Sequence, residues 1–242
     1  MTARSVVLSV LLGAHPAWAT VGELLRLTAD FDIKETALRV ALTRMVSAGD
    51  LVRSDDGYRL SDRLLARQRR QDAALHPVTR KWDGSWVTVV VTAVGTDART
   101  RAGLRNVLQN NRFAELREGV WLRPGNLTDP LPDEVRDRVR VLNARDDAPA
   151  ELARVLWDLP GWSATGQRLL CDMDGAADIP GRFTVAAAIV RHLLTDPVLP
   201  AELLPTDWPA DRLRAAYAGF AAQLLARRDA ATPAVARVLE VR

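Results

Sequence analysis

Apolar residues recur at helical spacing between residues 34 and 47, in the stretch KETALRVALTRMVS. Spacings of one, three and four place one set of apolar side chains on a single helix face: Ala37, Leu38, Ala41, Leu42 and Met45. The opposite face then carries Thr36, Arg39, Val40, Thr43 and Ser47. Gly49 is expected to end the helix, because glycine adopts left-handed backbone without steric cost. The stretch predicts an amphipathic helix with a basic, hydroxyl-bearing outer face.

A short β-hairpin is predicted directly after this helix. Leu51 and Val52 begin a strand, residues 55–57 form a turn, and residues 58–60 return. A helix followed at once by a hairpin is typical of a winged helix-turn-helix, in which the helix enters the DNA major groove and the hairpin reaches the flanking backbone. Many solvated helices also carry Thr and Arg outward, so the helix alone does not decide between the two interpretations.

The order of the preceding elements favours DNA binding. Residues 2–12 predict a first helix, residues 18–20 a short strand and residues 21–29 a second helix. Thr20 and Glu23 have the spacing of a capping box at the start of that second helix. The N-terminal residues also have the outline of a secretory signal, but their apolar stretch is short and interrupted by a serine.

Residues 62–74 predict a further helix, and a new domain follows it. The helix carries Arg63, Arg67, Arg69 and Arg70, which are typical of a solvated face, with a contact to DNA or to a dimer partner as the alternative. The next elements are strands at 86–94, 113–116, 119–123 and 138–142, with helices at 98–110 and 132–135. This βαββαβ order predicts a ferredoxin-like unit.

The last part of the chain is predicted to be mainly helical. Helices are expected at 149–159, 182–194 and 207–228, a loop at 160–166, and a stiff extended segment with four prolines at 196–209. The fold class is therefore α+β. Its predicted parts are a winged helix-turn-helix at 1–62, a linker helix at 63–81, a ferredoxin-like middle domain at 82–145 and a helical C-terminal domain at 146–242.

Charge is distributed unevenly along the chain. Residues 1–81 hold 13 basic and 9 acidic residues, a net charge of +4, whereas residues 82–242 hold 20 and 21 and have a net charge of −1. The excess positive charge thus lies with the predicted DNA-binding helix, which suits contact with phosphate. The only cysteine, Cys171, is interpreted as a small buried apolar residue, and a cytoplasmic protein is expected.

Three stretches together resemble a known family. They are ALRVALTRMVSAGDL with GYRLS behind it, the pair W-D-G-x-W at 82–86 and GVWLRP at 119–124, and DPVLPAELLPTDWP at 196–209. These motifs are similar to the recognition helix and wing, the middle domain and the C-terminal signature of the PaaX family of bacterial transcriptional regulators. The resemblance extends from residue 2 to about residue 220. It implies a cytoplasmic, dimeric DNA-binding repressor of a catabolic operon, with a middle domain that resembles the CRISPR adaptation endonuclease fold without its cleavage activity.

Residues on the helix and the wing are the candidates for DNA contact. Arg39, Thr43 and Arg44 are expected to reach base edges or phosphates, and Val40 a thymine methyl or else the wing. Lys34 and Thr36 lie near the helix N-terminus and suit phosphate, while Arg53 and Arg59 flank the turn of the wing. A dimer would require a palindromic double-stranded operator.

The resemblance also implies an effector, since known members of the family are released from DNA by an aromatic acyl-CoA thioester. The residues proposed for such a site are Trp121, Trp157, Trp162, Arg191, His192 and Trp208. The alternative is that these tryptophans only fill the core.

Two further classes of function are weighed against a regulator. A metal-dependent nuclease on the ferredoxin-like unit would need acidic ligands near strand ends, but Asp97 has a sufficient role as a helix cap and Asp172 and Asp174 are interpreted as part of a loop turn. A scaffold that binds partner proteins through the C-terminal helices is the other alternative. No motif for catalysis, metal or cofactor is recognised, so no enzyme activity, metal or cofactor is predicted.

Overall fold

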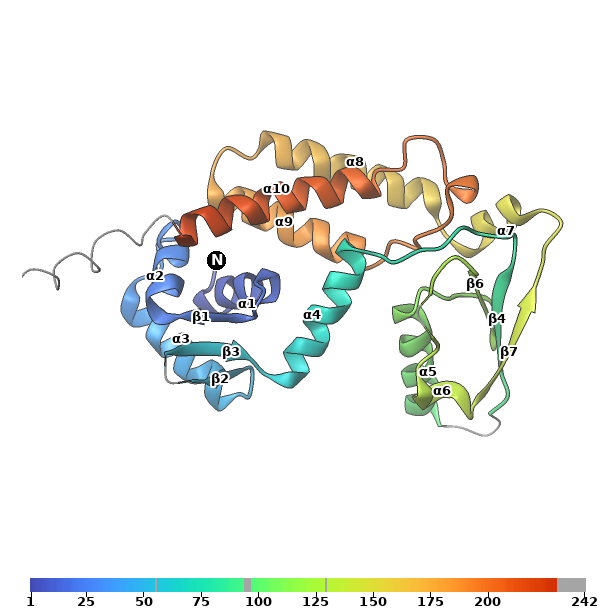
Figure 1. Cartoon of the computed structure of the whole chain (residues 1–242), viewed down its shortest axis with the longest axis horizontal. Helices are drawn as coiled ribbons and strands as arrows, with labels where there is room; N and C mark the ends of the chain where they lie inside the picture. Colours follow the sequence, from blue (N-terminus) through green and yellow to red (C-terminus); the bar gives the residue numbers. More distant parts are fainter. Residues whose placement is uncertain (55, 94–96, 129, 230–242) are drawn as a thin grey trace, which may run out of the picture. The chain divides into compact units, whose positions relative to one another are not determined.

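A computed structural model describes residues 1–54, 56–93, 97–128 and 130–229 (Figure 1). The chain forms two compact units, each built from separated segments. Unit 1 comprises Met1–Asp72, Leu169–Val190 and Arg212–Arg242, and unit 2 comprises Ala73–Arg168 and Arg191–Asp211. Among the described residues, no helix has the length and apolar character needed to cross a membrane.

Unit 1 contains the winged helix-turn-helix in the predicted order. Its elements are α1 (Ala3–Gly13), β1 (Trp18–Thr20), α2 (Val21–Ala29), α3 (Glu35–Ser47), β2 (Leu51–Arg53) and β3 (Gly57–Leu60). The three strands form an antiparallel sheet with β3 in the centre. The predicted capping box is confirmed, because the Thr20 hydroxyl accepts from the Glu23 backbone N–H at 3.1 Å and the Glu23 carboxylate accepts from the Thr20 N–H at 2.7 Å.

The core of the winged helix-turn-helix is made by the inner faces of α1, α2 and α3. It includes Val7 and Leu11 of α1, Leu24 of α2, and Leu38 and Leu42 of α3. The N-terminal apolar stretch is thus a packed helix of this domain. Gly49 ends the α3 region with a φ of +69°, as predicted. Ala37, predicted to face inward, is exposed, because it lies one position and about 100° around the helix from the buried Leu38.

The remaining segments of unit 1 pack against this domain. They come from α4 (Asp62–Leu75), α8 (Leu159–Gly175), α9 (Ile179–Leu193) and α10 (Ala210–Asp229). The Phe31 ring in the turn between α2 and α3 meets the Phe183 ring edge-on at 5.0 Å. Arg228 near the end of α10 donates to Glu23 at 2.7 Å, and Tyr217 accepts from Gln71 of α4 at 3.3 Å.

Unit 2 contains the predicted ferredoxin-like sheet. Its elements are β4 (Trp86–Val91), α5 (Ala98–Asn110), β5 (Ala114–Arg117), β6 (Val120–Pro124), α6 (Asp133–Arg136) and β7 (Val139–Ala144). The strand order is β5-β6-β4-β7 and every neighbouring pair is antiparallel, as a βαββαβ unit requires. The first predicted strand ends at Val91; its predicted last residue, Val94, lies outside the described residues.

Alternation along β4 divides the apolar side chains of unit 2 between two faces of the sheet. Val87, Val89 and Val91 join a cluster with residues of α5 and α6, which lie on one side of the sheet (Figure 1). Trp86 faces the other side and clusters with α7 (Pro149–Leu156) and the proline-rich segment. That segment is extended, with one short 3-10 turn at Ala201–Leu203, and buries Leu199 and Leu203 as predicted.

Two predictions for the C-terminal part are wrong. Residues 160–166 are not a loop but the first turns of α8, and α9 begins at Ile179 rather than at 182. Both helices start with the sequence D-x-P-G. In each, the Asp side chain accepts from the Gly backbone N–H three residues on, at 3.0 Å for Gly161 and 2.8 Å for Gly181. Proline suits the first turn, where its missing N–H has no intrahelical partner.

Side chains on α8 correct two further interpretations. Cys171 is exposed rather than buried. Asp172 and Asp174 lie on the helix rather than in a loop turn, and residues two apart on a helix do not face each other.

Candidate functional site

The outer face of α3 carries all six predicted DNA-contact residues of the helix as exposed side chains. They are Lys34 at the N-cap, Thr36, Arg39, Val40, Thr43 and Arg44. Their exposure follows from the inner face, because Leu38, Leu42 and Met45 are buried and recur at the spacing of one stripe. Val40, an apolar residue, is 50% exposed among these polar neighbours. The arrangement suits a helix that presents this face to a duplex.

Two of these side chains have partners within the helix. The Arg39 guanidinium pairs with Glu35 one turn earlier, with 2.7 Å between Nη2 and Oε1. The Thr43 hydroxyl donates to the Arg39 carbonyl at 3.0 Å. Both side chains of the ion pair are more than half exposed, and such a pair is worth only about 0.3–0.5 kcal/mol. Arg39 can therefore exchange Glu35 for a phosphate or a base at little cost.

The wing does not bring its two predicted arginines together. Arg53 of β2 lies opposite Tyr58, whereas Arg59 of β3 lies opposite Val52. Directly opposite residues share a face and successive residues alternate, so Arg53 and Arg59 project from opposite faces of the ribbon. Both are exposed. When one face of the wing contacts the DNA backbone, only the arginine on that face can reach the phosphates.

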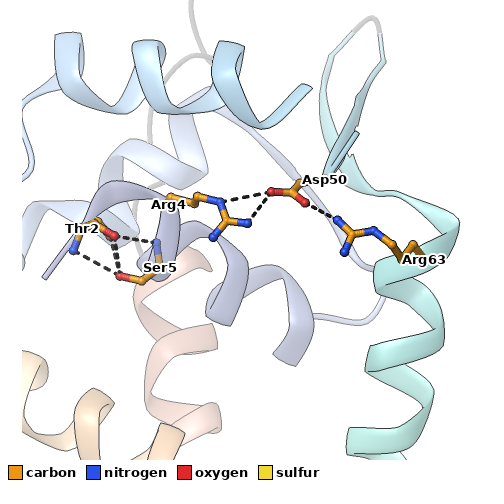
Figure 2. A network of polar contacts seen from close by, with 5 residues as sticks. All are labelled: Thr2, Arg4, Ser5, Asp50 and Arg63. Atoms are coloured by element: carbon orange, nitrogen blue, oxygen red, sulfur yellow. Dashed lines mark hydrogen bonds and ion pairs between the residues drawn. The ribbon is translucent and has the colours of Figure 1, made fainter. Parts of the chain in front are cut away.

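A buried carboxylate holds the base of α3, and sequence analysis missed it. Asp50 follows the α3 helix and its side chain is 3% exposed. Its Oδ2 accepts from Arg4 of α1 at 2.7 Å and its Oδ1 accepts from Arg63 of α4 at 2.6 Å (Figure 2). Its backbone N–H donates to the Met45 carbonyl at 2.9 Å. The Asp50 side chain thus links α1 and α4 to the end of α3, behind the exposed outer face of that helix.

The Asp50 contacts also assign a role to two arginines. Arg4 and Arg63 are more than half exposed, but their guanidinium groups reach inward to the same carboxylate. The sequence predicts for Arg63 only a place in a row on the linker helix that is solvated or contacts DNA or a dimer partner. Arg67, Arg69 and Arg70 of that row are exposed. In sequence, Asp50 follows a glycine and resembles an ordinary turn residue, and its partners are 46 and 13 positions away.

A second ion pair links α10 to the helix-turn-helix. Arg228 Nε lies 2.7 Å from Glu23 Oε1, with the side chains 18% and 15% exposed, and Arg227 pairs with Asp30 in the turn after α2. Burial by itself would raise the pKa of Glu23. Hydrogen bonds from the Thr20 backbone and from Arg228 outweigh that effect, and the pKa is lowered overall. Glu23 therefore stays ionised and serves both the α2 cap and α10.

The predicted effector residues separate into two groups. Trp157, Trp162 and His192 line one pocket of about 600 Å³ in unit 2, and Trp208 stacks on Trp162 with ring centroids 4.3 Å apart. Trp121 is elsewhere: it is buried in the cluster between the sheet and α5, as the core alternative expected. Arg191 is exposed and is not among the residues that line the pocket.

His192 is a partly buried ring in this pocket, and its pKa is lowered. Burial is the largest cause of its lowered pKa, and Arg168 adds to the lowering, while the hydrogen bond to the Trp162 carbonyl and the charge of Asp196 oppose it. Nε2 lies 3.0 Å from the Trp162 carbonyl oxygen. Because a carbonyl only accepts, Nε2 must carry the proton. Trp162 therefore contacts His192 in two ways. Their rings are stacked with centroids 4.1 Å apart, and the Trp162 carbonyl accepts a hydrogen bond from the His192 ring.

The acidic residues considered for a nuclease do not converge. Asp97 caps α5, where its carboxylate accepts from the Thr100 backbone N–H at 2.8 Å, and this hydrogen bond lowers the pKa of Asp97. Within the part of the chain that the structure describes, no three His, Cys, Asp or Glu side chains are grouped so as to hold a metal ion.

Comparison with protein-family models finds three matches that follow one another along the chain. They are a PaaX-like protein at residues 2–64, the PaaX protein central Cas2-like domain at 79–152 and the PaaX-like protein C-terminal domain at 182–232. Among solved structures, the uncharacterized protein Rv0674 from Mycobacterium tuberculosis is 70% identical, with a TM-score of 0.85 over 95% of this chain and 98% of that one. A comparison with curated proteins finds no match.

Proposed function

The chain belongs to the PaaX family, and on this basis we propose that it is a cytoplasmic, DNA-binding transcriptional regulator. The observation that carries the proposal is the two-sided character of α3. Its inner face is anchored by Leu38, Leu42 and the Asp50 network, and its outer face presents cationic and hydroxyl side chains to solvent. The helix is the part that enters the major groove, and the wing contacts the flanking phosphates.

The proposed contacts divide by chemistry. Arg39 and Arg44 project where a guanidinium can bond a guanine edge in two places, and Val40 can meet a thymine methyl. Lys34 and Thr36 sit at the α3 N-terminus, where the helix dipole also favours phosphate. Arg59 or Arg53 contacts the backbone from the wing, but the two do not act from the same face.

We further propose that the regulator is a homodimeric repressor of a catabolic operon and that a small-molecule effector releases it. Two copies related by a two-fold axis would read a palindrome, with half-sites one or two helical turns apart. Release requires an effector with different affinity for the bound and free states. The pocket with Trp157, Trp162 and His192 supports such a ligand site.

Electrophoretic gel shifts with the DNA upstream of the protein's own gene test this function. At low ionic strength we expect a specific complex that survives excess competitor DNA, and footprinting should show a two-fold symmetric protected site. The apparent affinity should fall steeply as salt rises, because phosphate contacts release counterions. A protein that ignores this DNA and other duplexes at low salt would leave the scaffold as the better hypothesis.

We propose that the chain is not an enzyme. The acid after the first ferredoxin-like strand is engaged as a helix cap, and Asp172 and Asp174 diverge on α8. Incubation with single- and double-stranded DNA and RNA in Mg²⁺ or Mn²⁺ tests this directly. Cleavage that is removed by Asp97→Asn would make the nuclease the better hypothesis.

A further inference from the structure

The outer face of the wing sheet carries a row of side chains that crosses three strands. β3 lies between β1 and β2, and Arg59 of β3 is directly opposite Trp18 on one side and Val52 on the other. Directly opposite residues share one face of a sheet. The other face packs on the core of the domain through Leu51 and Leu60. Arg59 therefore stands between an indole and a valine on the face that is turned away from the core.

The Trp18 indole connects β1 to the turn of the wing. Trp18 Nε1 donates to Ser54 Oγ at 3.1 Å, and the Ser54 hydroxyl donates to the Gly57 carbonyl at 3.2 Å. Because Ser54 directly follows β2, the first of these bonds spans β3, the middle strand. Gly57 also lies against β1, since a Cβ at this position would overlap the Ala19 carbonyl oxygen. The hairpin is thus held to β1 by a side chain as well as by the backbone.

The two wing arginines differ in how their surroundings order them. Arg59 has a neighbour on both sides, and its pair with Asp62 is weak, because the two groups are 4.0 Å apart and the Asp62 side chain is 97% exposed. Arg53 ends an edge strand and has only Tyr58 opposite it, whose ring packs toward the core. A side chain that is already confined loses less rotamer freedom when it binds a ligand. Arg59 is therefore the better prepared of the two to bind a phosphate.

We infer that Trp18 is a positioning residue of the wing, which holds the outer face so that Arg59 binds a phosphate of the DNA backbone. It acts through its hydrogen bond to Ser54 and through its ring beside Arg59. The inference rests on the proposed function in taking DNA as the partner of the wing, and it assigns the contact to Arg59 rather than Arg53. A phosphate contact reads no base, so its contribution is the same on every sequence and falls as salt rises.

Replacement of each wing arginine tests which face makes the contact. The measurement is fluorescence anisotropy over a series of salt concentrations, with the upstream DNA and a scrambled duplex of the same length. Arg59→Gln should weaken binding to both by about tenfold at low salt and reduce the slope of log affinity against log salt by about 1. Arg53→Gln makes the same change on the opposite face and should leave the slope unchanged. Equal changes in the two variants, or a change in Arg53→Gln alone, would overturn the inference.

Trp18→Phe tests the positioning role, because it keeps an aromatic ring and removes only the indole N–H donor. It should weaken binding to both duplexes several-fold with a lowered salt slope, and have little further effect in an Arg59→Gln background. A residue that only stabilises the fold would weaken binding equally in both backgrounds, and that result, or no loss at all, would overturn the inference. The matched control is Trp82→Phe, which removes an indole hydrogen bond to the Ser85 carbonyl in unit 2 and should leave DNA affinity unchanged.

Hydrogen exchange in the free protein separates this inference from the proposed function. In Trp18→Phe, a peptide covering residues 51–60 should exchange faster than in the parent, while one covering residues 120–124 of unit 2 should not change. If the parent binds its upstream DNA and Trp18→Phe alters neither exchange nor affinity, the positioning role fails and the regulator stands. If exchange in the wing rises but the parent binds no duplex at low salt, the hydrogen bond to Ser54 does hold the wing, while the phosphate contact and the regulator fail together.

Discussion

Two carboxylates of the same helix-turn-helix, Asp50 and Glu35, pair with arginine but differ in burial, and the difference separates a role in stability from a role in DNA contact. Asp50 lies behind α3 with 3% of its side chain exposed and accepts from two arginines. Glu35 lies on the front of α3 with 55% of its side chain exposed and pairs with Arg39 alone. The donor groups are identical and the N–O distances are similar, at 2.6–2.7 Å. Distance alone therefore says nothing about which pair matters for stability.

The contribution of each ion pair to stability depends on its exposure to solvent. A buried carboxylate has lost its water and depends on its partners, so removing the interaction is costly. An exposed pair exchanges readily with water and is screened by salt. Asp50 should therefore fix the position of α3, while Glu35 only occupies Arg39 until a phosphate or base replaces it. Each prediction below tests one side of this comparison.

The largest effect is expected at Asp50. Asp50→Asn keeps the volume but removes the charge that Arg4 and Arg63 share, and it turns an amide donor toward at least one of them. We expect the free energy of unfolding to fall by about 2–3 kcal/mol, the loss of one or two charged hydrogen bonds. Urea unfolding followed by circular dichroism at 222 nm measures this.

Asp62→Asn is the matched control for Asp50. Asp62 lies 4.0 Å from Arg59 with 97% of its side chain exposed. Its replacement should change stability by less than about 1 kcal/mol. Equal losses in the two variants would show that burial is not what distinguishes these carboxylates.

Local signals in the sequence were sufficient for most of the fold. The Thr20–Glu23 cap, the α3 stripe and the βαββαβ order all depend on residues a few positions apart, and all appear in the structure apart from Ala37 of the stripe, which is exposed. The Asp50 network could not be predicted, because its partners meet only after the chain folds. The start of α8 also has a local signal, because Asp158 caps the turn that contains Pro160 and Gly161, but the same proline and glycine are equally typical of a loop.

The second effect concerns DNA and tests the front of α3. Arg39→Ala should weaken binding to the cognate operator by about 1–3 kcal/mol if Arg39 reads a base, with little change on unrelated DNA. Arg154→Ala, on the exposed side of α7, should leave both unchanged. Fluorescence anisotropy with labelled duplexes gives both affinities. Equal weakening on all sequences would assign Arg39 to phosphate instead.

An intermediate effect is expected at Glu23, whose pair with Arg228 lies between the other two in burial. The folded pKa of Glu23 is lowered from its ordinary value near 4.5. Its contribution is therefore complete above pH 4.5 and is lost as the pH falls through the folded pKa. Glu23→Gln should cost about 1 kcal/mol at pH 7 and reduce the slope of stability against pH in the acid range.

Thermal unfolding from pH 3 to pH 7 measures the Glu23 effect. Arg228→Gln should reproduce part of it, because the Glu23 carboxylate still accepts from the Thr20 backbone N–H and hydroxyl in that variant. If the slope of stability against pH in the acid range is unchanged in Glu23→Gln, groups other than Glu23 determine the loss of stability in acid.

The smallest effect on stability, and one of opposite sign on binding, is expected at Glu35. Glu35→Gln removes an exposed pair and a favourable charge at the α3 N-terminus, so stability should fall by only a few tenths of a kcal/mol. The same change frees Arg39 and removes a negative charge next to phosphate, so DNA affinity should rise a few-fold at low salt and approach the parent value at high salt. In an Arg39→Ala background, Glu35→Gln should raise DNA affinity less, because there is no Arg39 side chain for it to free. The double-mutant cycle measures the coupling between the two residues. Weaker operator binding by Glu35→Gln alone would mean that Glu35 itself accepts from a cytosine amino group.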